Sequence, residues 1–173
     1  IDKISKVSSL NKKQLTETIN QLTNTDFGTK NENKTVLQHG DKDFKLLPNF
    51  YKKKICTLED EDWYIGGRVD GMSKKDGIDT IVEVKNRVHR LFYKLRDYEK
   101  VQVYAYMFIH NIDRAQLIEN YRKSDESKIN TIDIKWEDNF WNDEIYPKII
   151  YFIDKFKLFM KDDVNKVKLL LDT

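Results

Sequence analysis

Three strand-like segments follow one another closely between residues 52 and 84, and this spacing restricts the fold more than any other feature of the sequence. The segments 52–58, 63–72 and 79–84 are rich in β-branched and aromatic residues, and acidic or glycine-containing turns separate them. Connections this short join antiparallel strands, because a parallel crossover needs a dozen residues or more. The sequence therefore predicts an antiparallel three-stranded meander.

Helical and strand-like patterns flank this meander. Stripes of apolar residues predict a helix containing Leu15, Ile19 and Leu22, a second helix over 28–38, a third over 89–110 and a fourth over 138–162, which Pro147 kinks or breaks. Alternating residues predict strands at 114–121 and 129–136. The order ααβββαββα predicts an α/β (α+β) fold, with a central mixed sheet of about five strands flanked by helices. The stripe expected on helix 89–110 comprises Leu91, Leu95, Tyr98, Gln102, Ala105 and Ile109.

Length and composition predict one folded domain. The 173 residues suit a single core, which we divide into an N-terminal helical extension (1–25), a core (26–136) and a C-terminal helix (137–173). Hydrophobic residues make up 39% and charged residues 35%, and no apolar run reaches membrane-spanning length, so no membrane partner is expected. The lone Cys56 excludes internal disulfides and favours an intracellular, reducing compartment. The sequence begins at Ile1, which leaves open a targeting segment removed earlier.

The segment Ile81–Arg87 carries opposite charges inside a strand that is otherwise apolar. Glu83 and Lys85 lie two residues apart, so in a strand their side chains share one face. Burying charge is costly unless the charge has a partner. A solvated pair on an edge strand would explain these two residues alone. The neighbouring acidic residues favour a functional site instead.

Acidic residues on neighbouring elements predict a site for a divalent cation. Asp70 and Glu83 fall at the ends of adjacent predicted strands, and Glu32 falls on the second predicted helix. Carboxylates, with a backbone carbonyl such as that of Val84, are the oxygen ligands that Mg²⁺ prefers. Phosphodiester hydrolysis needs such an ion to polarise the phosphate and generate hydroxide near neutral pH. Lys85 would then orient or help deprotonate the water and offset negative charge on the phosphorus.

Polar and basic residues after this strand extend the predicted site. Gln102 and Tyr106 are spaced i, i+4 and share a helix face, where they could brace Lys85 or contact a phosphate backbone. The net charge is only +2, so nucleic-acid binding requires a local concentration of basic residues. Residues that could bind phosphate follow the strand directly, although a solvated helix face explains them equally well: Arg87, His89, Arg90 and Lys94.

Four short motifs in this order resemble the PD-(D/E)XK nuclease superfamily, in particular its RecB-like and lambda-exonuclease-like (YqaJ-type) members. The motifs are GTKNE at 28–32, GRVD at 67–70, EVK at 83–85 and QVYAY at 102–106. The resemblance implies a restriction-endonuclease-like core and DNA cleavage dependent on one or two Mg²⁺ or Mn²⁺ ions. It implies that the metal ligands are Glu32, Asp70, Glu83 and the Val84 carbonyl, and that the catalytic residues are Asp70, Glu83, Lys85, Gln102 and Tyr106. The family's proline before the aspartate is Val69 here.

Several functions remain open at this stage. The resemblance favours an exonuclease or end-processing enzyme of DNA recombination, repair or replication, with DNA preferred to RNA as the partner. A structure- or sequence-directed endonuclease on the same core, acting on DNA or RNA, is the first alternative. The second is a nucleic-acid-binding module with a degenerate site. A homo-oligomer or an accessory protein also stays open, since no residue pattern addresses assembly.

Overall fold

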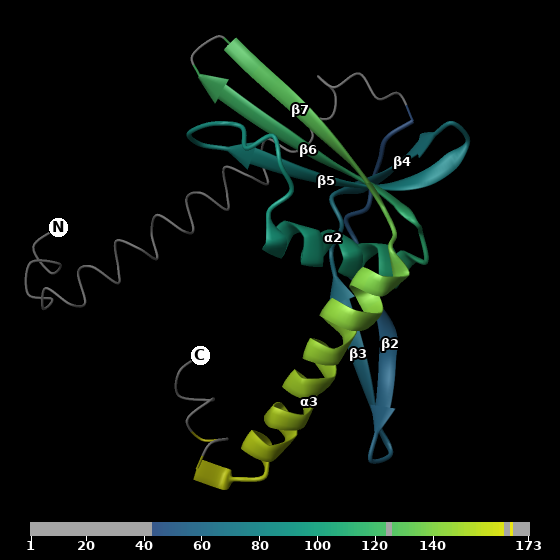
Figure 1. Cartoon of the computed structure of the whole chain (residues 1–173), viewed down its shortest axis with the longest axis vertical. Coiled ribbons are helices and arrows are strands. Elements are labelled where there is room, and N and C mark those ends of the chain that lie inside the picture. The colour runs from purple at the N-terminus through teal and green to yellow at the C-terminus, as the bar shows by residue number, and fades with distance from the viewer. Residues whose placement is uncertain (1–42, 124–125, 165–166, 168–173) are drawn as a thin grey trace, which may run out of the picture. The chain divides into compact units, whose positions relative to one another are not determined.

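The computed structural model describes residues 43–123, 126–164 and 167 of the chain (Figure 1). Both helices predicted before residue 40, and with them Glu32, lie outside these ranges. The chain divides into two compact units, residues 1–134 and 135–173. Within the described ranges, no helix is long and apolar enough to cross a membrane.

The first unit is built on a mixed five-stranded sheet in the order β1-β4-β5-β6-β7, which confirms the predicted fold class. Strands β4 and β5 are antiparallel, whereas β5 and β6 are parallel. Helix α2 (Asp97–His110) connects β5 to β6 and contacts both strands (Figure 1). The bounds of the five strands are β1 (Lys45–Leu46), β4 (Gly71–Lys75), β5 (Ile78–Arg87), β6 (Arg114–Lys123) and β7 (Glu126–Lys135).

The predicted three-stranded meander is wrong, because its second segment breaks at residues 68–70. Strands β2 (Tyr51–Leu58) and β3 (Glu61–Gly67) form a separate two-stranded sheet, and β4 starts afresh at Gly71. At the break, the side chain of Asp70 accepts a hydrogen bond from the backbone of Val84 and replaces a ladder hydrogen bond. Gly71 also lies so close to Phe44 and to the Lys45 carbonyl that a Cβ there would be 2.6 Å from that oxygen.

Strand β5 is the centre of the core. Val82 and Val84 are buried with Ile118 of β6 on one face of the sheet, where Phe44 and Ile129 pack against them. The opposite face carries Glu83 and Lys85, because successive side chains of a strand alternate. The charged pair therefore lies on the face from which α2 contributes Gln102. The apolar core and the polar cluster use the two faces of one strand.

Helix α2 is shorter than predicted and turns a different face inward. The segment 89–96 is a loop, since the Glu119 carboxylate accepts hydrogen bonds from the backbone N–H groups of Phe92 and Tyr93. The helix begins after Arg96, where Glu99 reaches back to the Arg96 N–H in a capping box. The predicted apolar stripe is wrong at Tyr98, which is 57% exposed. The buried positions are Glu99, Val103, Tyr104 and Met107.

The second unit is helical from Asp138 to Met160. A π-helical segment, η2 (Phe140–Ile145), leads into α3 (Tyr146–Met160). Pro147 lies in the first turn of α3, where the missing N–H of proline costs no helical hydrogen bond. The predicted kink or break at Pro147 therefore lies where the π-helical segment η2 passes into the α-helix α3. Within this unit, the rings of Trp136 and Trp141 pack 5.2 Å apart.

Candidate active site

Asp70 is the residue immediately before strand β4, which begins at Gly71. Gly71 is paired with Val82, so Asp70 stands one residue beyond the last pair of the ladder. Its Oδ2 accepts a hydrogen bond of 2.7 Å from the backbone N–H of Val84. An antiparallel strand residue directs its N–H and C=O to the same neighbour, so the Val84 carbonyl also faces the Asp70 edge. Asp70 is thereby held beside the part of the β5 edge that β4 does not pair with.

Glu83 is the buried centre of a polar cluster. Its side chain is 4% exposed, and its Oε1 forms an ion pair of 2.6 Å with the Lys85 ammonium. Gln102 of α2 closes a triangle, because its Nε2 donates to Glu83 Oε1 at 3.0 Å and its Oε1 accepts from Lys85 Nζ at 3.0 Å. The Gln102 Nε2 also donates to the Tyr106 hydroxyl at 2.9 Å. Two residues of β5 and two of α2 thus form one hydrogen-bonded network.

Burial controls the protonation of this cluster. Burial raises the pKa of Asp70 above the ordinary range, against the opposing effects of the Val84 N–H and the Lys85 charge. Burial alone would lower the pKa of Lys85, but Glu83 and Asp70 outweigh it and the net shift is upward. Burial also raises the pKa of Tyr106. Lys85 is therefore a cation and Tyr106 a neutral phenol near neutral pH.

Because Asp70 binds the N–H of Val84, the residue after Glu83, a half-buried and a buried carboxyl group lie near one another. Two carboxylates and the carbonyl edge of Val84 are hard oxygen donors, which suit Mg²⁺ or Mn²⁺. Among residues 43–123, 126–164 and 167, no group of three or more His, Cys, Asp or Glu side chains is placed to hold a metal. Glu32, the third predicted acidic ligand, lies outside the described residues. The described donors therefore fit an ion that also keeps water ligands.

The four predicted phosphate-binding residues separate into two groups. Arg87 does not extend toward solvent: its side chain is 9% exposed and forms ion pairs with Glu99 at 2.6 Å and with Glu119 at 2.8 Å. This placement gives Arg87 a structural role in place of the predicted phosphate contact. His89, Arg90 and Lys94 are exposed in the loop before α2.

The cluster of Arg87, Glu99 and Glu119 escaped the sequence analysis. Both glutamates are fully buried, and Glu119 also accepts a hydrogen bond of 3.0 Å from Asn130. Glu119 is paired with Lys85 in the parallel ladder, so this second cluster adjoins the first on the same face of the sheet. Only the paired acidic residues could have revealed it, and they lie 12 and 32 positions from Arg87.

Gly67 belongs to the GRVD motif, and the structure shows a steric reason for a glycine at this position. A Cβ at this position would be 2.6 Å from Cε1 of the Tyr106 ring. Real Cβ atoms do not approach ring carbons so closely, so a larger residue would push Tyr106 aside. The end of β3 and the middle of α2 thus meet at the residue that closes the polar network.

No protein-family model matches this chain, and no curated protein matches it. Among solved structures, one described as "Crystal structure of SSO0001" is similar, with a TM-score of 0.43 and 19% sequence identity. The match covers 60% of this chain and 48% of that one, so it spans about half of the matched protein's length. Function is therefore inferred from the residues of this chain.

Proposed function

We propose that the chain is a metal-dependent nuclease that hydrolyses DNA phosphodiester bonds. The observation that carries the proposal is the position of the Lys85 ammonium, which is held by Glu83 and Gln102 beside the carboxylate of Asp70. A half-buried cation next to one buried and one half-buried carboxyl group is costly to maintain for stability alone. Perturbed charges gathered from separate elements are typical of catalytic sites.

Asp70, Glu83 and the carbonyl of Val84 would hold Mg²⁺ or Mn²⁺. When bound, such an ion polarises the phosphate and lowers the pKa of a bound water. Lys85, whose pKa is raised, offsets the negative charge that develops on the phosphate and orients the water as a hydrogen-bond donor. The same upward shift disfavours Lys85 as a general base at neutral pH. Gln102 fixes the direction of the ammonium through the hydrogen bond of 3.0 Å.

Tyr106 completes the donor set. Its hydroxyl oxygen accepts a hydrogen bond from Gln102, so its own proton is available for a phosphate oxygen. Its raised pKa keeps that proton in place near neutral pH. The arrangement provides donors from β5 and α2 at a single polar cluster. An exonuclease or end-processing enzyme and an endonuclease on the same core would both use these donors.

Cleavage of linear and covalently closed circular DNA in Mg²⁺ or Mn²⁺ tests the proposal. We expect ion-dependent cleavage that Lys85→Ala reduces by about 10²-fold or more, since one preorganised electrostatic group is lost. Lys74→Ala, at an exposed lysine of β4, is the matched control and should leave cleavage unchanged. Attack on linear DNA alone indicates an exonuclease, and attack on both forms indicates an endonuclease.

Binding without cleavage would support the alternative of a degenerate binding module, and a parallel RNA substrate tests the choice of DNA. The proposal fails if neither ion supports cleavage of any of these substrates. It also fails if Lys85→Ala cleaves as fast as the parent protein does. Folding of both lysine variants is verified by circular dichroism, because Lys85 neutralises a buried carboxylate.

A further inference from the structure

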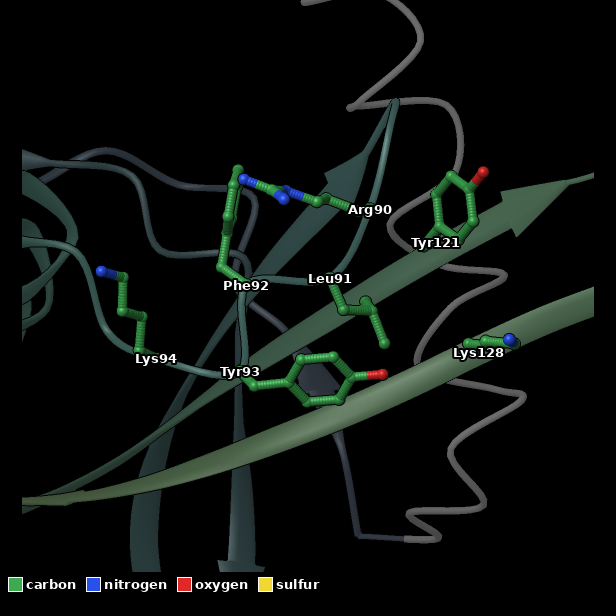
Figure 2. Close-up of a pocket in the computed structure, with 7 residues that line it drawn as sticks. All are labelled: Arg90, Leu91, Phe92, Tyr93, Lys94, Tyr121 and Lys128. Carbon is green, nitrogen blue, oxygen red and sulfur yellow. The ribbon is translucent and has the colours of Figure 1, made fainter.

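A pocket of about 550 Å³ opens next to the loop between β5 and α2 (Figure 2). The loop contributes Arg90, Tyr93 and Lys94, and the sheet contributes Tyr121 of β6 and Lys128 of β7. Buried Leu91 lies between the two tyrosine rings in this view. This volume falls within the range of pockets that hold small ligands. Aromatic and cationic side chains line it, and no acidic residue does.

The backbone of the loop presents Tyr93 outward. Tyr93 has a φ of 56°, a left-handed conformation that is strained for an aromatic residue. The buried carboxylate of Glu119 maintains it, because its Oε2 accepts the Tyr93 N–H at 2.9 Å. The ring itself is 67% exposed. An exposed ring held in a strained conformation by a buried acid indicates a function for the ring.

Positive charge lines the pocket. Arg90, Lys94 and Lys128 all line the pocket, and each is exposed. In the part of the chain that the structure describes, no carboxylate forms an ion pair with any of the three. Cations without carboxylate partners that line a pocket together with exposed aromatic rings match the phosphates and the base of a nucleotide.

The pocket and the polar cluster share one face of the sheet. Arg87 is paired with Tyr121 and Lys85 with Glu119, so these side chains continue the face that carries Glu83. From Glu83 to Arg87 the strand advances about 13 Å at 3.3 Å per residue. Successive bases stacked along a nucleic-acid strand are about 3.4 Å apart. The pocket thus lies within a few nucleotides of the Asp70–Glu83 cluster.

We propose that this pocket binds one unstacked nucleotide of a single-stranded nucleic acid, with its base on the Tyr93 ring and its phosphates at Arg90, Lys94 and Lys128. The inference rests on the proposed function, since it assumes a nucleic-acid substrate. It adds a second site, remote from the scissile bond, that fixes the position of the strand. A base can reach the ring only when it leaves the duplex stack, so the site favours single strands or frayed ends.

Binding of a fluorescein-labelled fifteen-residue oligothymidylate, measured by anisotropy in EDTA, tests the pocket without cleavage. We expect Tyr93→Gly to weaken binding about 5- to 100-fold through loss of stacking. The same change should raise or maintain the melting temperature, because glycine adopts a positive φ without strain. Tyr151→Ala is the control, since it removes from α3 a ring that is 64% exposed, and it should leave binding unchanged.

Two further arms locate the nucleotide. An abasic residue moved along the oligonucleotide should weaken binding at one position, and Tyr93→Gly should abolish that dependence. Lys128→Ala should reduce the slope of log K against log salt by about 0.7, whereas Lys74→Ala should not. An oligouridylate arm separates RNA from DNA, and preference for either supports the pocket.

Equal affinity of the parent protein and Tyr93→Gly, or no sensitive abasic position, would overturn the pocket. Equally strong binding of duplex DNA would overturn the preference for an unstacked base. None of these outcomes touches the cleavage experiment, which addresses Lys85. Ion-dependent cleavage with no effect at Tyr93 therefore refutes the pocket alone. Binding that depends on Tyr93 in a protein without cleavage refutes the nuclease alone.

Discussion

Asp70→Asn is expected to reduce cleavage by about 10²–10³-fold and at the same time to stabilise the fold. Asparagine can still accept the Val84 N–H through its carbonyl oxygen, so the local geometry is retained. Burial raises the pKa of Asp70, which means that the ionised carboxylate destabilises the folded state. The neutral amide removes that penalty together with the metal ligand. Opposite effects on activity and stability distinguish a catalytic carboxylate from a structural one.

Thermal unfolding as a function of pH measures the stability half of this prediction. Because the folded pKa is raised, the parent protein should lose stability as the pH rises from the ordinary aspartate range through the folded pKa. Asp70→Asn should lack that decline. Mg²⁺ should raise the melting temperature of the parent protein and not that of the variant. A variant that is less stable at neutral pH, or that still cleaves DNA at the parent rate, would contradict the assignment.

Arg87→Met is expected to destabilise the protein by about 3–5 kcal/mol, because it leaves Glu99 and Glu119 buried without their cation. Arg90→Met is the matched control, since Arg90 is exposed and lines the pocket. It should change the free energy of unfolding by less than about 0.5 kcal/mol. In oligonucleotide binding, measured at a temperature where both variants are folded, the order should reverse: Arg90→Met should weaken binding more than Arg87→Met does. Urea denaturation gives the first comparison and anisotropy the second.

The loss at Arg87 should depend on pH. Burial alone would raise the pKa of Glu99, but Arg87, together with hydrogen bonds from the Arg96 N–H and Tyr98, makes the net shift downward. A lowered pKa contributes stability that is present above about 4.5, the ordinary value, and is lost as the pH falls through the folded pKa. The difference between the parent protein and Arg87→Met should therefore be largest at neutral pH and shrink in acid. A stability difference that does not change with pH would exclude the ion pairs as its source.

Local periodicity accounts for the parts of the site that the sequence could predict. Glu83 and Lys85 share a face because the strand period is two, and they meet at 2.6 Å. Gln102 and Tyr106 share a helix face at i, i+4, and they meet at 2.9 Å. Neither rule depends on distant residues. The mixed sheet likewise follows from the order of strand and helix patterns.

Partners distant in sequence decided the features that could not be predicted. The break before β4 depends on a hydrogen bond between Asp70 and Val84, fourteen residues away. The late start of α2 depends on Glu119, which binds the loop from the next strand. Arg87 resembles its exposed basic neighbours in sequence, and only the buried glutamates draw it inward. Residue type and spacing do not specify such tertiary partners.

Anomalous scattering from crystals soaked in Mn²⁺ tests the central claim most directly. The account predicts one or two manganese peaks between the carboxylates of Asp70 and Glu83, and their loss in crystals of Asp70→Asn. Glu83 would exchange part of its contact with Lys85 for the ion, since the ammonium now lies 2.6 Å from Oε1. Crystals of the parent protein that show no manganese between these two carboxylates would contradict the account.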